Sequence, residues 1–126
     1  MPKTPRISEA EWVVMRLLWE EAPRTANEVV EAVAGAQQWQ ARTVKTLLGR
    51  LVRKGALKYR AEGRTYYYTP AVSEKNCVRA ESRSFIDRVF GGALTPMLAE
   101  FIETTPLSQA EIEELKRLLD KKEGGK

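Results

Sequence analysis

The sequence predicts a mainly α-helical protein with one small β-hairpin, divided into two domains. Apolar residues recur at helical spacing along most of the chain, and the spacing changes to strict alternation only after Gly55. The charge divides as well, because residues 1–70 hold 12 Lys and Arg against 7 Asp and Glu, whereas residues 71–126 hold 9 against 10. We therefore expect a basic domain at residues 1–71 and a second domain at residues 72–126.

The composition argues against catalysis and against a bound metal. The 126 residues include no histidine, which removes the commonest general base and both Ser-His-Asp and Cys-His sites. The sequence contains no glycine-rich phosphate loop and no dinucleotide fingerprint. The single cysteine, Cys77, has no partner for an internal disulfide or a zinc site, and we expect it to be buried. The prediction is no enzyme, no cofactor and no metal.

Nothing in the sequence marks the chain for a membrane or for export. No apolar run approaches the roughly 20 residues that a membrane-spanning helix needs. The first residues, MPKTPRISEAEW, contain no apolar signal-peptide core. We therefore expect a cytoplasmic protein that does not insert into a membrane.

Two capping boxes predict the first two helices. The stretch Ser8–Glu11 opens a helix over about residues 9–20, and the stretch Thr25–Glu28 opens a second helix that ends around Gly35. In each case the apolar residues that follow recur on one face, which predicts that this face packs into a core. These residues are Trp12, Met15, Leu18 and Trp19 in the first helix, and Val29, Val30 and Val33 in the second.

A third helix is predicted between Gln40 and Gly55, with Gly55 as the residue that terminates it. Its inward stripe consists of Val44, Leu47, Leu48, Leu51 and Val52. Gly49 lies on the opposite, polar face, where it costs roughly 1 kcal/mol of helix propensity relative to alanine. This position indicates that something approaches the backbone closely there.

The polar face of this third helix and the segment after it carry a strong positive charge. Only one acidic residue, Glu62, lies between Arg42 and Arg64. Such an excess of one sign indicates a polyanion as partner, because ordinary solvated faces mix both signs. The basic residues of this stretch are Arg42, Lys45, Arg50, Arg53, Lys54, Lys58, Arg60 and Arg64.

Alternation of apolar and charged residues then predicts a β-hairpin with its turn at Glu62-Gly63. Tyr66 and Tyr68 share one face of the second strand and are expected to pack on the helices, while Tyr67 lies on the other face. Three helices followed by a basic hairpin are typical of a winged helix-turn-helix domain.

The second half of the sequence predicts three further helices. The first covers about residues 74–90, the second is expected to begin at Thr95 and the third at Ser108. A unit of this size cannot easily bury a core of its own, so we expect a C-terminal three-helix homodimerisation domain. The alternative is a subdomain folded back on the first domain. The predicted dimer contacts are Phe85, Val89, Phe90, Leu94, Leu98, Phe101, Ile102, Leu115, Leu118 and Leu119.

The basic helix predicts binding to double-stranded DNA, because a helix fits the major groove and Arg, Lys and Thr can contact base edges there. Near the start of the helix, we assign base contacts to Arg42, Thr43, Lys45 and Thr46. Further along, we assign phosphate contacts to Arg50, Arg53 and Lys54. In the hairpin, Arg60 and Arg64 suit the DNA backbone or a minor groove.

Six stretches, in order and covering residues 7 to about 119, together resemble the penicillinase repressor family of BlaI, MecI and CopY type. They are ISEAEWVVMRLLW, TANEVVEAV, WQARTVKTLLGRLVRKGAL, GRTYYYTP, SFIDRVFGG and LSQAEIEELKRLL. The resemblance implies a dimeric winged-helix transcriptional repressor of a palindromic operator, with control of β-lactam resistance genes as one expectation. It also implies that the DNA-contacting helix carries Arg42, Thr43, Lys45, Thr46 and Arg50.

Two positions depart from the family pattern. Antibiotic-responsive members contain an Asn-Phe bond that is cleaved in response to a membrane sensor protease, and this chain has Glu100-Phe101 at the matching positions. The carboxylate changes the charge and hydrogen bonding of the scissile position. Copper-responsive members carry cysteine pairs near the C-terminus, and this tail, DKKEGGK, has none. The inducing signal is left open.

Other classes of function give different expectations. A protein-interaction adaptor would use the basic helix to bind an acidic partner, with little affinity for any duplex at physiological salt. An RNA-binding winged helix would prefer structured or single-stranded RNA to B-form DNA.

Overall fold

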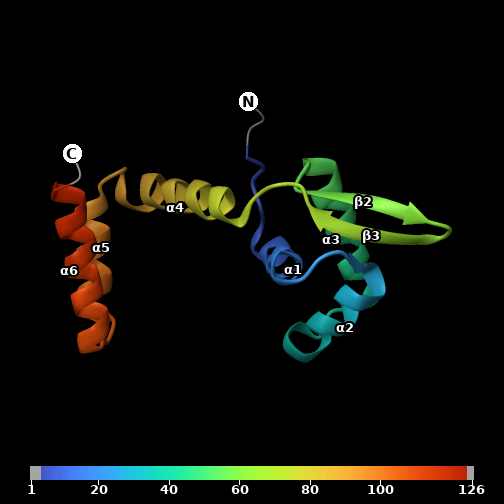
Figure 1. The fold of residues 1–126 in the computed structure, drawn as a ribbon, viewed down its shortest axis with the longest axis horizontal. Helices are drawn as coiled ribbons and strands as arrows, with labels where there is room; N and C mark the ends of the chain where they lie inside the picture. The colour runs from blue at the N-terminus through green and yellow to red at the C-terminus, as the bar shows by residue number, and fades with distance from the viewer. Residues whose placement is uncertain (1–3, 125–126) are drawn as a thin grey trace. The chain divides into compact units, whose positions relative to one another are not determined.

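The computed structural model describes residues 4–124, and at residue 36 it describes the backbone alone (Figure 1). The chain forms two compact units, the first ending at Ser82 and the second beginning at Arg83. The elements are α1 (Glu9–Glu20), β1 (Arg24–Thr25), α2 (Ala26–Gln37), α3 (Ala41–Lys54), β2 (Leu57–Glu62), β3 (Thr65–Pro70), α4 (Glu74–Phe90), α5 (Leu94–Thr104) and α6 (Gln109–Gly124).

Both predicted capping boxes are confirmed. At the start of α1 the Glu11 amide donates to the Ser8 hydroxyl at 3.2 Å, and the Ser8 amide donates to the Glu11 carboxylate at 2.8 Å. Thr25 and Glu28 make the same exchange at the start of α2. Helix α2 ends close to the predicted position around Gly35, at Gln37, and the next residue adopts the left-handed conformation.

Helix α3 has the predicted bounds and the predicted inward face. Gly55 follows it with φ of 85°, and the amide of Ala56 donates to the carbonyl of Leu51 at 2.9 Å, which closes the helix in a Schellman motif. Its buried residues are Val44, Leu47, Leu48 and Leu51.

The predicted hairpin belongs to a three-stranded antiparallel sheet with the order β1-β3-β2. Glu62 pairs with Thr65, so the turn is Gly63-Arg64, one residue later than predicted, with Gly63 at φ of 63°. The two-residue strand β1, which the sequence did not predict, pairs Thr25 with Tyr67 and so joins the start of α2 to the hairpin.

The face shared by Tyr66 and Tyr68 only partly packs on the helices. Tyr68 packs against the core, but Tyr66 is 47% exposed and lies against Tyr59 of the neighbouring strand, with ring centroids 4.8 Å apart and the ring planes tilted by 37°. The prediction for Tyr66 is therefore wrong, because its position nearer the turn carries it beyond the helices.

The core of the first unit lies between α1, α2, α3 and the sheet, and it includes Ile7 before α1 and Cys77 in α4. The predicted burial of Cys77 is confirmed, and burial raises the pKa of its thiol. Cys77 therefore behaves as a small apolar residue, and the first turns of α4 belong to the first unit.

The second unit has little interior of its own. Among the described residues, α5 and α6 contain no buried side chain. Phe85 stacks on Phe101 at 6.4 Å and meets Phe90 edge-on at 5.9 Å. The predicted cap at Thr95 is wrong, because α5 begins at Leu94, whereas the predicted capping box at Ser108 is confirmed.

None of the helices formed by residues 4–124 is both long and apolar enough to span a membrane.

Candidate nucleic-acid interface

The polar face of α3 is a row of solvent-exposed cations and threonines. Because the stripe from Val44 to Leu51 is buried, the helix cannot turn about its own axis without exposing core residues. The opposite face is therefore held toward solvent. Within residues 4–124, none of the four basic residues on this face that precede Lys54 forms a salt bridge with an acidic side chain. The exposed residues are Arg42, Thr43, Lys45, Thr46, Arg50 and Arg53.

Lys54 has different surroundings from these residues. Its ammonium forms a salt bridge with Glu11 of α1 and donates a hydrogen bond to the carbonyl oxygen of Arg6 at 2.9 Å. The Glu11 side chain is 1% exposed and the Lys54 side chain is 36% exposed. The ammonium of Lys54 thus has protein partners on α1 and on the segment before it.

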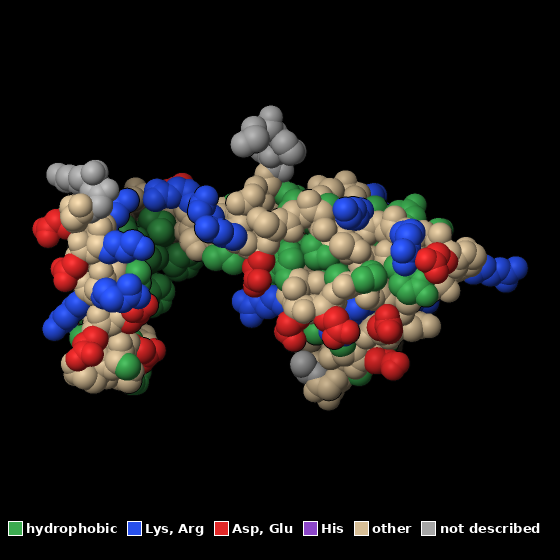
Figure 2. Space-filling model, viewed as in Figure 1, with side chains coloured by type: hydrophobic (Ala, Val, Ile, Leu, Met, Phe, Trp, Pro, Cys, Tyr) green, Lys and Arg blue, Asp and Glu red, His purple; other side chains and the backbone are tan. Residues whose placement is uncertain are grey.

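In the hairpin, the two candidate arginines also differ from each other. The Arg60 guanidinium is 3.0 Å from the Glu62 carboxylate and lies 5.1 Å from the centre of the Tyr67 ring. Arg64 lies in the turn and is exposed. Lys and Arg side chains extend from the hairpin end of the first unit, with one acidic group beside them, whereas most acidic side chains of this unit gather in the region of α2 in this view (Figure 2).

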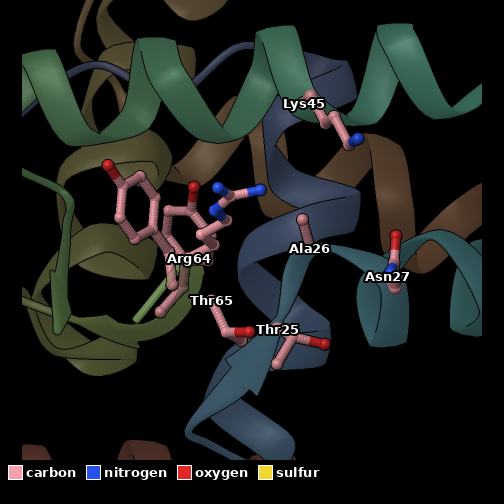
Figure 3. Close-up of a pocket in the computed structure, with 8 residues that line it drawn as sticks. Thr25, Ala26, Asn27, Lys45, Arg64 and Thr65 are labelled. Carbon is pink, nitrogen blue, oxygen red and sulfur yellow. The ribbon is translucent and has the colours of Figure 1, made fainter. Parts of the chain in front are cut away.

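A hollow of about 330 Å³ lies where the start of α2, helix α3 and the hairpin meet. Figure 3 shows Lys45 entering this space from α3 and Arg64 entering it from the hairpin. Two cations from separate elements in one open hollow favour an anion. The lining residues are Thr25, Ala26, Asn27, Lys45, Arg64, Thr65, Tyr66 and Tyr68.

The sequence alone does not indicate this hollow, because the hairpin and the start of α2 are separate along the chain. The two parts are joined by β1, where Arg24 pairs with Tyr68 and Thr25 with Tyr67. A strand of two residues has no periodicity, so no local pattern in the sequence could have revealed it.

The predicted dimer residues lie in the second unit, and most of them are exposed. Phe85, Phe90, Leu98 and Leu115 are half-buried. The exposed members are Val89, Leu94, Phe101, Ile102, Leu118 and Leu119. Hydrophobic side chains gather in this unit below the end of α4 (Figure 2). A surface with this many large apolar side chains is typical of an interaction site.

Nearly the whole sequence of this chain matches one family of known proteins. Residues 7–121 match the sequence model of the penicillinase repressor family. The chain belongs to the penicillinase repressor family. The family is one of transcriptional repressors and not of enzymes. This membership confirms the resemblance that the six sequence stretches carried.

Two relatives illustrate how completely this family member aligns. The penicillinase repressor of Bacillus licheniformis is 38% identical over 120 residues, which cover 95% of this chain and 94% of the relative. The methicillin resistance regulatory protein MecI of Mammaliicoccus sciuri is 35% identical over 95% of this chain and 98% of MecI.

Solved structures of the family match part of this chain. The DNA-binding domain of the repressor BlaI is 39% identical with a TM-score of 0.54, covering 60% of this chain and 93% of that domain. The monomeric form of Bacillus licheniformis BlaI, solved in complex with the blaP half-operator, gives a TM-score of 0.52 at the same identity and coverage. These matches confirm the predicted winged helix-turn-helix fold.

Proposed function

We propose that this penicillinase repressor family member is a transcriptional repressor that binds double-stranded DNA as a homodimer at a palindromic operator. The observation that carries the proposal is the exposed basic face of α3, opposite a fully buried apolar stripe. Cations that have no acidic partner among residues 4–124, all on one helix face, suit a polyanion that accepts a helix in its groove. The BlaI relative that was solved with a half-operator supports DNA as this polyanion.

In this proposal α3 lies in the major groove. Residues near its start reach base edges, because recognition helices normally contact bases with their first turns. Arg and Lys there bind guanine acceptors, and Thr contacts bases or the thymine methyl group. The assigned base contacts are Arg42, Thr43, Lys45 and Thr46, and the assigned phosphate contacts are Arg50 and Arg53.

The hairpin and the hollow bind the DNA backbone beside the groove. A backbone phosphate that enters the hollow meets Arg64 of the hairpin, while Lys45, which lines the hollow from α3, reaches the adjacent base edge. Arg64 is the stronger candidate of the two hairpin arginines, because the Arg60 guanidinium is already shared between Glu62 and the Tyr67 ring. Arg60 serves to stiffen the hairpin and to contact the backbone at its outer face.

The second unit supplies the dimer contacts. Its exposed apolar side chains, among them Ile102 and Leu119, are not buried within the unit itself, so another surface must cover them. A two-fold dimer covers the same surface on both copies and places two recognition helices on the two half-sites of a palindrome. Linking two weak half-site contacts raises affinity by a factor of about 10² to 10⁴.

Release of DNA follows from loss of this dimer, whatever signal causes it. Cleavage between Glu100 and Phe101 in response to a membrane sensor protease is one route, and β-lactam resistance genes are then the regulated class. Both residues are exposed on α5, and the Glu100 carbonyl accepts a hydrogen bond from the Thr104 hydroxyl at 2.7 Å. The helix must therefore open locally before a protease can bind an extended segment.

The test is selection of duplex fragments by the purified protein, from genomic DNA of its source and from a random-sequence library. The proposal expects enrichment of a short two-fold symmetric sequence, with half-sites about one helical turn apart or a multiple of it. Enrichment of no sequence would contradict a specific repressor. Retention of an acidic protein in place of DNA would favour the adaptor interpretation.

A further inference from the structure

Glu11 is the one charged residue among the described residues whose side chain is buried. Its carboxylate is shared, because the same oxygen, Oε1, accepts from the Ser8 amide and from the Lys54 ammonium. A buried carboxylate needs such partners, since an unpaired charge in an interior is costly. The Lys54 side chain remains partly exposed, but its ammonium is bound to the start of α1 and to the Arg6 carbonyl.

This ion pair joins three segments of the first unit. Lys54 is the last residue of α3, Glu11 lies in the first turn of α1, and Arg6 precedes α1. Each charge also suits its own helix end, because a cation is favoured at a C-terminus and an anion at an N-terminus. The contact thus fixes the end of α3 against α1 and against the segment that leads into it.

We infer that Lys54 is a positioning residue for the recognition helix, acting through Glu11, and that it does not bind DNA phosphate itself. The inference rests on the proposed function. An α-helix of 14 residues is about 21 Å long, so a tilt of about 5° at its C-terminal end moves its first turn by about 2 Å. Base contacts need closer placement than that, whereas phosphate contacts by long side chains tolerate it.

The test compares Lys54→Met and Glu11→Gln with the wild-type protein on two 24-base-pair duplexes, one selected by the wild type from a random library and one scrambled. Glutamine keeps an acceptor for the Ser8 amide but removes the charge that binds Lys54. Arg53→Met is the matched control, because Arg53 is the neighbouring exposed cation of α3. Anisotropy titrations across a range of salt give the affinity and its salt dependence.

A positioning role predicts that Lys54→Met and Glu11→Gln each lower the ratio of selected to scrambled affinity about tenfold, and that the double variant is no worse than either. Both should keep the wild-type salt slope. Lys54→Arg keeps a positive charge that can pair with Glu11, so its ratio of selected to scrambled affinity should equal that of the wild type. Arg53→Met should instead weaken both duplexes and reduce the salt slope by about 0.9.

Three results would overturn the inference. If Lys54→Met reduced the salt dependence of affinity while Glu11→Gln kept the wild-type affinities, Lys54 would be a phosphate ligand. Unchanged affinities in both variants would leave the ion pair a role in stability alone. Failure of the wild type to bind any duplex would overturn the proposed function as well. If circular dichroism shows Lys54→Met unfolded, Glu11→Gln and the double variant give the same readout without an unpaired buried charge.

Discussion

The indole N–H of Trp19 donates a hydrogen bond to the carbonyl oxygen of Val72, at 3.0 Å. Trp19 is in the last turn of α1, and Val72 lies in the short segment between β3 and α4. Together with the buried Cys77 in the second turn of α4, this bond fixes the start of α4 on the first unit. The start of α4, which connects the DNA-binding unit to the second unit, is therefore held against the first unit.

Trp19→Phe should keep most of the packing and remove this hydrogen bond. The free energy of unfolding should fall by about 1 kcal/mol, the size of one hydrogen bond plus some lost contact area. Denaturant unfolding of the two proteins measures the change. Trp39→Phe is the control, because within residues 4–124 the Trp39 indole makes no hydrogen bond, and an equal loss there would show that ring size alone is responsible.

Gly49→Ala should make the protein more stable and its DNA complex weaker. A Cβ at this position would meet only the mobile end of Arg53, at 3.5 Å, so the fold has room for it. Helix propensity predicts a gain of about 1 kcal/mol in the free energy of unfolding. If DNA approaches the backbone here, affinity for the selected duplex falls at the same time. Unchanged affinity would show that no close approach occurs.

Arg42→Ala and Lys45→Ala test the recognition face. Each should reduce affinity for the selected duplex by about 1 to 3 kcal/mol if its side chain contacts a base. Selection repeated with each variant should relax the preference at one position of each half-site. A uniform loss over all duplexes would instead assign that residue to phosphate.

If the second unit forms the proposed dimer, Ile102→Glu should convert that dimer to monomers. The Ile102 side chain is half exposed on α5, and in a two-fold dimer the substitution places a charge in the interface twice. Burying an apolar side chain of this size contributes about 1.5 to 3 kcal/mol, so dissociation should be favoured by at least about tenfold. Sedimentation equilibrium measures the change, with Lys116→Glu on α6 as the control. A monomeric wild type would contradict the dimer.

Acid should weaken the first unit through Glu11. Burial alone raises the pKa of this carboxyl, but the Lys54 ammonium and the Ser8 amide together outweigh it and hold the pKa below its usual 4.5. A lowered pKa means stability that is present above pH 4.5 and lost as the pH falls through the folded value.

In Glu11→Gln this loss should be absent, so below pH 4.5 its unfolding free energy should depend less steeply on pH, by at most about 1.4 kcal/mol per pH unit. Urea unfolding at a series of pH values measures the slope. Parallel slopes for the variant and the wild type would show that Glu11 does not titrate in this range.

The sequence predicted those parts of the fold that are encoded locally. Capping boxes at Ser8, Thr25 and Ser108 are confirmed because each needs only residues within one turn of a helix. The strand β1 and the exposure of Tyr66 were not predictable in this way, since both depend on where the hairpin lies against α2.

In the candidate site, too, the sequence predicted the local features and not those that depend on distant residues. The basic face of α3 followed from helical spacing, and the exposed positions of Arg42 and Arg53 agree with that spacing. The surroundings of Lys54 did not follow from it, because its partner Glu11 is distant in sequence and was explained fully by its capping box. A residue can satisfy a local motif and a distant charge at once, and only the folded arrangement reveals the second role.

Specific operator binding is tested by an anisotropy titration of the selected duplex against its scrambled counterpart at about 0.15 M salt, with the stoichiometry measured on the same complex. Specific repressor binding predicts two protomers per duplex and a preference of at least about 10³ for the selected sequence. Equal affinity for both duplexes, lost steeply as salt rises, would contradict it and would leave the α3 face as a general polyanion surface.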